Sequence, residues 1–112
     1  MKNIVTLSGT PDFEPFEGLK GKLVHTKSQT YAFWEIKEGS ILPEHKHINE
    51  QVSFVTKGEL ELTIDGKMTL LKKGDVAIIP PNVLHSAIAI THVELTDVFT
   101  PIREDFPNYQ KL

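Results

Sequence analysis

The sequence predicts an all-β protein built as a sandwich or barrel, and three observations support this prediction. Short segments rich in β-branched and aromatic residues recur along the chain, separated by glycines and prolines. Several segments alternate apolar and polar residues with the period of a strand, and no stretch has convincing helical periodicity. A chain of 112 residues can bury the core of one domain, which we expect to span residues 1–112.

The first half of the chain is expected to contain several short strands. A strand over residues 4–7 precedes a loop over residues 8–21, which contains Pro11 and Pro15. Further strands are predicted from residue 23, over residues 31–36 and over residues 51–56, where β-branched and aromatic side chains dominate.

The second half begins with a half-buried strand, in which Leu60, Leu62 and Ile64 alternate with polar residues. The pair Asp65-Gly66 predicts a type I′ hairpin turn, after which residues 68–71 return. Residues 76–79 are apolar throughout and are therefore predicted to be buried on both faces. The prolines at 80 and 81 end that strand, and the last strands are expected over residues 85–90 and 92–99.

Composition excludes several classes of protein. The net charge is −3 without a cluster of Lys and Arg, which argues against a nucleic-acid partner. The chain has no cysteine, so neither a disulfide scaffold nor thiol chemistry is available. No signal peptide or membrane-spanning segment is apparent, and we expect a cytoplasmic protein.

Histidines dominate the chemistry that the sequence offers. His45 and His47 would share one face of an extended chain, and His85 lies on a later predicted strand. Imidazole is the commonest metal ligand in proteins, and Gln51 adds a carbonyl oxygen. Three nitrogens and one oxygen that converge inside a small barrel would form a metal site with room for outside ligands. The alternative is a pair of half-exposed histidines beside a turn.

The spacing around these residues resembles the two motifs of the cupin superfamily. Five residues separate Gly39 from His45, and three separate His47 from Gln51, before a glycine at 58. The second motif is matched by Gly74, the proline at 80 and the histidine at 85. Two positions depart from the pattern, with Gln51 in place of Glu and Asn82 in place of Gly. Because Asn tolerates positive φ, the second departure still permits the turn. The resemblance implies a jelly-roll barrel.

Strand alternation indicates which side chains enter such a barrel. If His85 points inward, the small residues at 87 and 89 do so too, and Ile88 and Ile90 point outward. On the last strand, the face that carries Val93, Leu95, Asp97 and Phe99 is apolar except for Asp97 and must be the inward one. A buried carboxylate needs a partner or a function. The alternative is an Asp that bonds to backbone at a strand end.

Residues 97–106, DVFTPIREDF, resemble the closing segment of the KdgF family of pectin and alginate degradation. In that family an Asp, a Phe and an Arg of this segment line the cavity, which here implies Asp97, Phe99 and Arg103. The family's metal set implies His45, His47, Gln51 and His85 as ligands of one divalent ion of Ni, Zn, Mn, Fe or Co.

The resemblance further implies conversion of 4,5-unsaturated monouronates, which polyuronate lyases release, to linear ketonised sugars. Asp97 would transfer protons, Arg103 would bind the substrate carboxylate, and Phe99 would shape the wall beside the ring. A surface ion pair with Glu104 or Asp105 is the alternative for Arg103. A cupin dioxygenase and a non-catalytic sugar-binding cupin are the alternative functions. The uncharged set of protein ligands argues against the dioxygenase, because oxygen-activating Fe(II) sites commonly use two His and one carboxylate.

The remaining expectations concern side chains outside this set. His25 and His92 are interpreted as structural, and Trp34 as core or interface rather than as a sugar platform. Outward Ile88, Ile90 and Val98 predict a homodimer that buries part of one apolar face, as in other cupins of this size.

Overall fold

The computed structural model describes residues 3–110, which form ten β-strands and one short 3-10 helix but no α-helix. No helix in this range is long and apolar enough to cross a membrane. The elements are η1 (Leu7–Gly9), β1 (Phe13–Phe16), β2 (Leu19–His25), β3 (Thr30–Ile36), β4 (Ile41–His45), β5 (Glu50–Lys57), β6 (Glu59–Ile64), β7 (Lys67–Lys72), β8 (Val76–Ile79), β9 (His85–Ala89) and β10 (Val93–Thr100).

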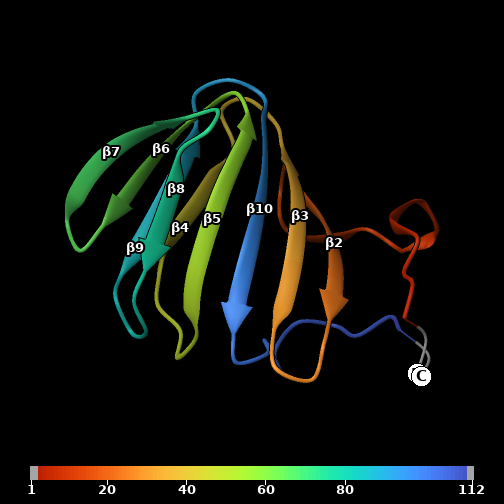
Figure 1. The fold of residues 1–112 in the computed structure, drawn as a ribbon. Helices are drawn as coiled ribbons and strands as arrows, with labels where there is room; N and C mark the ends of the chain where they lie inside the picture. Colours follow the sequence, from red (N-terminus) through yellow and green to blue (C-terminus); the bar gives the residue numbers. More distant parts are fainter. Residues whose placement is uncertain (1–2, 111–112) are drawn as a thin grey trace.

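The strands form two antiparallel sheets, which confirms the predicted all-β jelly roll. The larger sheet has the order β1-β2-β3-β10-β5-β8, and the smaller has the order β4-β9-β6-β7. Figure 1 shows β10 in the middle of the larger sheet, between β3 and β5. Inward-facing apolar side chains of both sheets form one buried cluster. The last strand therefore packs at the centre of the sandwich, where its inward side chains line the space between the sheets.

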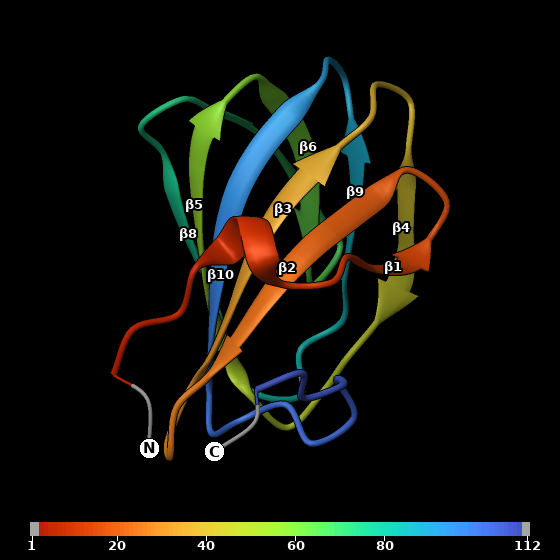
Figure 2. The same cartoon turned by 90° about the vertical axis from the view of Figure 1, so that its right-hand side faces the viewer.

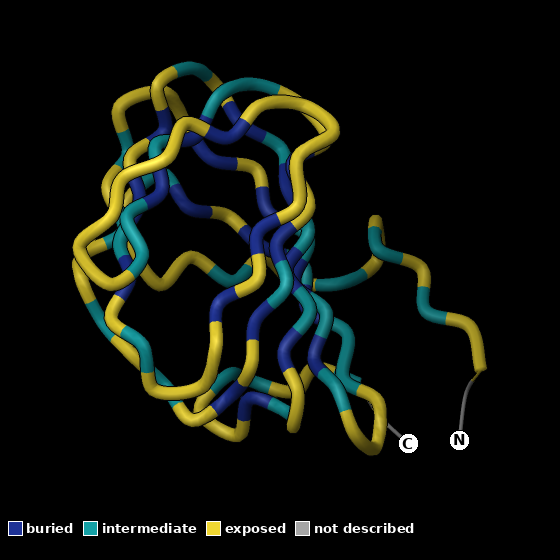
Figure 3. Tube along the Cα trace, turned by 60° about the vertical axis from the view of Figure 1, so that its left-hand side comes forward, coloured by how far each residue is buried: buried dark blue, intermediate teal, exposed yellow. Residues whose placement is uncertain are grey.

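The predicted alternation of inward and outward residues on β10 and β9 is confirmed. On β10 the residues from Val93 to Phe99 that share the predicted inward face are buried, and on β9 His85, Ala87 and Ala89 are buried. Figure 3 shows the same alternation of buried and more exposed residues along the strands. Asp97 is thus an inward residue in the middle of a central strand.

Two turns adopt the backbone conformations that their residues favour. Asp65 has φ +49° and Gly66 has φ +78°, as expected of a type I′ hairpin turn between β6 and β7. Asn82 has φ +61°, in the left-handed region that Asn tolerates. The exchange of Gly for Asn in the second motif therefore leaves its turn intact.

The N-terminal segment differs from the prediction. Residues 4–6 form no strand, and the 3-10 helix of Leu7–Gly9 follows. The side chain of Ile4 is 80 % exposed, so burial of this side chain does not favour a strand here. The predicted loop contains strand β1, which pairs only with β2 at the edge of the larger sheet. Pro15 is tolerated there because, in an edge strand, some backbone N–H groups have no neighbouring strand to donate to.

The prediction that residues 76–79 are buried on both faces is wrong. Ala77 and Ile79 are buried, but Val76 is 52 % and Ile78 is 65 % exposed. Strand β8 lies at the edge of the larger sheet, and its outer face is not covered by any other described element. Apolar composition alone could not distinguish this strand from one enclosed on both sides.

The predicted apolar face of Ile88, Ile90 and Val98 is not one surface. Ile88 lies on β9 of the smaller sheet, with Ile90 just beyond it, and Val98 lies on β10 of the larger sheet. All three point away from the core, so they belong to opposite outer faces of the sandwich. A single two-fold contact cannot cover both faces.

The C-terminal segment, residues 101–110, lies across one end of the sandwich, at the bottom of Figure 2. Asn49 donates hydrogen bonds to the carbonyl oxygens of Pro101 and Ile102, and Thr30 accepts one from the backbone N–H of Arg103. The ring of His25 bonds to the carbonyl oxygen of Pro107 at 2.9 Å. A segment without regular secondary structure is in this way fixed as a wall of the space between the sheets.

Candidate active site

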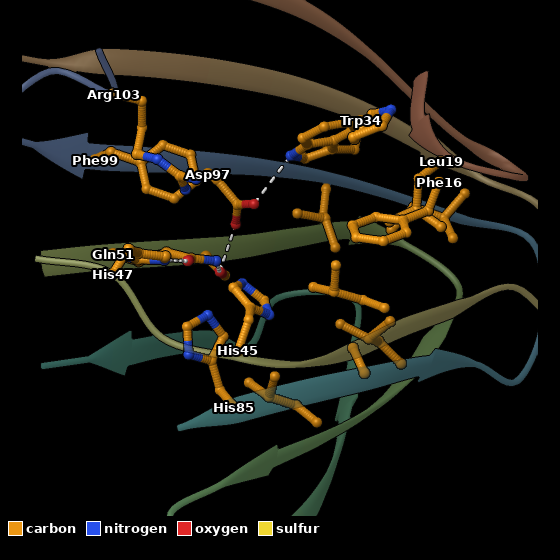
Figure 4. A pocket seen from close by; sticks show the side chains of 18 of the residues that line it. Phe16, Leu19, Trp34, His45, His47, Gln51, His85, Asp97, Phe99 and Arg103 are labelled. Carbon is orange, nitrogen blue, oxygen red and sulfur yellow. Dashed lines mark hydrogen bonds between the residues drawn. The ribbon is translucent and has the colours of Figure 1, made fainter. Parts of the chain in front are cut away.

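Three histidines meet at one end of the sandwich. His45 ends β4 and is paired in register with His85, which begins β9, and His47 follows in the loop after β4. One nitrogen of each ring lies within 4.8 Å of the nitrogens of the other two. Figure 4 shows His45, His47 and His85 around one part of the cavity. The structure therefore brings the three predicted histidines together around one space.

Hydrogen bonds define the tautomer of each ring. The Nδ1 atoms of His45, His47 and His85 lie 2.9, 3.0 and 2.9 Å from backbone carbonyl oxygens two residues away. Because a carbonyl oxygen only accepts, each Nδ1 carries a proton, and in the neutral ring the lone pair then lies on Nε2. The Nε2 atom of His85 is buried and has no hydrogen-bond partner among the described residues. These are the features of metal ligands whose second nitrogen is held by the backbone.

The protonation states agree with this interpretation. Burial lowers the pKa of His85 to about 4 and also lowers the pKa of His47. Both rings are therefore neutral at pH 7, as metal binding requires. The residues present fit a divalent transition-metal ion, and three imidazoles suit several such metals.

Gln51 lies beside this cluster on β5. Its Oε1 is 3.1 Å from Nε2 of His47, and its Nε2 donates to Oγ of Ser53 at 3.1 Å. The amide oxygen therefore faces the histidines. In the neutral, Nδ1-protonated form of His47, this amide oxygen and the ring Nε2 would both be available to one cation.

Asp97 lies across the cavity from the histidines and is 7 % exposed. Ser53 donates a hydrogen bond to its Oδ1, and the indole N–H of Trp34 donates to its Oδ2 at 2.9 Å. Burial raises the pKa of this carboxyl to about 6, and the donors Ser53, Gln51 and Trp34 oppose that rise. The alternative of an Asp bonded to backbone at a strand end does not apply, since its partners are side chains.

Arg103 is buried against aromatic rings, although it also forms the ion pair that was the alternative for it. Its guanidinium carbon lies 4.8 Å from the centroid of the Phe99 ring and 3.9 Å from that of Phe106. Its Nε and Nη2 donate to the two carboxylate oxygens of Asp105 at 2.9 and 2.8 Å. The side chain of Arg103 is 9 % exposed, whereas that of Asp105 is 66 % exposed. These bonds leave Nη1 available for another acceptor.

The cavity that contains these groups has a volume of about 440 Å³. Its polar part is formed by the histidines, Gln51, Ser53, Asp97 and Arg103, and the remainder is mostly apolar. Figure 4 shows Phe16 and Leu19 in the apolar part, beyond Trp34. Phe99 packs edge-on against His47, with ring centroids 5.5 Å apart. The size is within the range of pockets that bind small molecules.

Two residues that donate hydrogen bonds to Asp97, Ser53 and Trp34, were not predicted to belong to the site. Ser53 could have been found, because it lies two residues after Gln51 on one strand and so shares its inward face. Trp34, interpreted from the sequence as core or interface, is buried, and its N–H reaches Asp97 across the sheet. That contact depends on the pairing of β3 with β10, which no local pattern reveals.

The chain is similar to cupins in both sequence and structure. Residues 32–99 match the Cupin domain family. The chain is 31% identical over 100 residues to the pectin degradation protein KdgF of Dickeya dadantii, covering 87% of this chain and 91% of that protein. A solved RmlC-like cupin from Shewanella frigidimarina is 30% identical, with a TM-score of 0.88 and coverage of 96% of this chain and 97% of that one. KdgF from a Halomonas species superposes with a TM-score of 0.85 at 22% identity, covering 94% and 98%, a likeness of fold.

Proposed function

We propose that this chain, which belongs to the cupin superfamily and within it to the KdgF family, opens the ring of 4,5-unsaturated monouronates. The products would be linear ketonised sugars. The relative from Dickeya dadantii is a pectin degradation protein, and lyases that cleave polyuronates release sugars of this kind. Galacturonate-derived and alginate-derived substrates share the reacting group, and the proposal covers both.

One observation carries the proposal, the buried carboxyl of Asp97 opposite three convergent imidazoles. A pKa raised to about 6 allows this group both to accept and to donate a proton near neutral pH. A binding module has little use for an acid–base group held in this way inside its cavity. The geometry therefore supports an enzyme better than a sugar-binding protein.

The reaction requires two proton movements and no net change in composition. Removal of the proton from O1 allows the C1–O5 bond to break, so that C1 becomes an aldehyde and O5 an enolate. A proton delivered to C4 then converts the C4–C5 double bond into a C5 ketone. Asp97 can remove the first proton and deliver the second, since the carboxyl returns to its starting state after both steps.

His45, His47, His85 and Gln51 would hold one metal ion. When bound, such an ion supplies Lewis-acid stabilisation of developing negative charge on oxygen. Arg103 would bind the substrate carboxylate through the part of its guanidinium that Asp105 leaves free. Phe99 supports this guanidinium from below and forms a wall against which the sugar ring can pack.

The alternative of a dioxygenase receives less support. Among the described residues, the group that can hold a metal consists of three histidines and contains no carboxylate. Oxygen-activating Fe(II) sites commonly use two histidines and one carboxylate. The carboxyl of Asp97 is instead engaged by Ser53 and Trp34.

The direct test is conversion of an unsaturated monouronate prepared by exhaustive lyase digestion. The purified protein, supplied in turn with several divalent metals, should accelerate the loss of ultraviolet absorbance of the conjugated double bond above the spontaneous rate. NMR of the product should show the C5 ketone. If no metal yields acceleration, the proposed function is wrong.

We also propose a homodimer formed through the outer face of the larger sheet. Apolar side chains align across five strands of this face in the order Ile78, Val52, Val98, Tyr31 and Val24. Phe54 and Val76 extend the apolar surface and are 40 % and 52 % exposed. Apolar patches of this kind mark interfaces. The cytoplasmic location stays a prediction.

A further inference from the structure

We propose that Trp34 is a positioning residue for Asp97 and that close packing of the indole ring against Gly21 fixes the position of the ring. This inference deepens the proposed function, since it assigns the origin of the orientation of the proposed acid–base group. Trp34 is the only tryptophan of the chain. It lies on β3, directly between β2 with Gly21 and β10 with Asp97.

The contact between Gly21 and Trp34 is unusually close. The two residues are paired across β2 and β3. A Cβ added at Gly21 would lie 2.7 Å from both Cε3 and Cζ3 of the Trp34 ring and 3.1 Å from Cη2. Real Cβ atoms essentially never approach other atoms so closely, so any larger residue would displace the ring. Gly21 is buried, and the benzene part of the indole therefore lies against the bare backbone of β2.

The packing against Gly21 directs the other side of the indole toward Asp97. With the benzene part over β2, the indole Nε1 lies 2.9 Å from Oδ2 of Asp97 on β10. Ser53 donates to the other oxygen from the opposite side, and its hydroxyl accepts from the amide of Gln51. The carboxylate is thus held between one donor from β3 and one from β5, and Figure 4 shows the bond from Trp34 to Asp97 as a dashed line.

Loss of one donor would free the carboxylate to rotate. Without the indole N–H, Asp97 is held from β5 alone, where Ser53 donates to Oδ1, and rotation about the bond from Cβ to Cγ can exchange the two oxygens. Proton transfer requires a defined lone pair in reach of the reacting atoms, so small displacements lower turnover steeply. Removal of groups that orient metal ligands typically lowers activity about 10- to 100-fold, and we expect an effect of this size for the group that orients Asp97.

The test combines NMR with kinetics on the full chain. Because the chain has one tryptophan, its indole N–H gives a single resonance in a ¹⁵N–¹H spectrum, and Trp34→Phe identifies it by its disappearance. Gly21→Ala and Asp97→Asn should each shift this resonance, the first by moving the ring and the second by removing the charged acceptor. Gly9→Ala is the matched control, since a Cβ there meets nothing within 4 Å.

Kinetics distinguish positioning from a merely structural role. Trp34→Phe and Gly21→Ala should lower kcat about 10- to 100-fold with KM changed less than about 3-fold and metal content unchanged. An unshifted indole resonance in both Gly21→Ala and Asp97→Asn would overturn the inference. So would wild-type kcat in Trp34→Phe. A wild-type protein that fails to convert unsaturated uronates would refute the proposed function instead, and the indole resonance would then decide by itself whether Gly21 and Trp34 orient Asp97.

Discussion

Asp97→Asn should remove a pH dependence from the stability of the protein while it abolishes most of the turnover, whatever constant difference the loss of one accepted hydrogen bond adds. The substitution keeps the shape of the side chain and removes its charge. Asp97 is buried in a mostly apolar cavity, and burial raises its pKa from 3.8 to about 6. The folded protein therefore disfavours the ionised form that the reaction needs as a base.

The magnitude follows from this shift. A difference of roughly two pKa units between the folded and unfolded chain corresponds to about 3 kcal/mol. The sign is that of a raised pKa: the folded state holds the proton more tightly, so the stability linked to this group is fully present below the unfolded pKa of 3.8. It is lost as the pH rises through about 6. Wild type should thus lose about 3 kcal/mol from this group across that window, and the Asn variant should not.

Urea unfolding of both proteins at several pH values between about 4 and 8 measures this difference, because the contributions of all other groups cancel between them. The samples should be stripped of metal with a chelator, since a nearby cation would lower the pKa of Asp97 by Coulomb attraction. The turnover of the metal-loaded variant should fall about 10²- to 10⁴-fold, the span of general acid–base catalysis.

Two results would refute this reasoning. A difference in the free energy of unfolding that stays constant between acidic and neutral pH would show that Asp97 has an ordinary pKa. A variant that retains wild-type turnover would show that another group transfers the protons.

Three further outcomes are expected. Arg103→Ala should raise KM more than it lowers kcat in steady-state kinetics, because its proposed contact with the substrate carboxylate is uniform binding, and the reverse pattern would contradict that role. His85→Ala should reduce metal content from about one ion per chain to well below one by elemental analysis, whereas exposed His92→Ala should leave it unchanged. Ile78→Glu, on the outer face of the larger sheet, should yield a monomer in sedimentation experiments, whereas Ile90→Glu on the other side of the sandwich should not; dissociation by the second variant alone would place the interface on the smaller sheet.

Local patterns in the sequence were sufficient for much of the fold. Alternation along β6 and β10 identified their inward faces, and Asp65-Gly66 identified a hairpin turn, because both depend on residues close in the chain. The motif spacing of the histidines and Gln51 also predicted that these residues lie close together, as they do in the structure. Patterns failed where the outcome depended on the order of strands in a sheet. Whether β8 is enclosed, and whether Val98 lies on the same outer face as Ile88, follow from pairings between segments far apart in sequence.

The same limit explains why the role of Trp34 could not be predicted. Its position as a buried residue follows from composition and alternation, but its contact with Asp97 requires that β3 lie beside β10. The packing of the indole against Gly21 requires in addition that β2 lie on the other side of β3. A glycine in a strand is often explained by a bulge or a close approach, and here the approach is that of a side chain.

The C-terminal segment suggests a division of labour that protein engineers could use. The three clustered histidines, Gln51 and Asp97 all lie within residues 32–99, the part that matches the Cupin domain family, whereas Arg103 lies after it. The segment that carries Arg103 is attached by side chains such as Asn49 and Thr30. This segment could therefore be varied in sequence without changing the strands that carry the clustered histidines and Asp97. Libraries confined to residues 101–110 should alter the proposed recognition of the substrate carboxylate while the side-chain donors to Asp97, the proposed proton-transfer residue, stay in place.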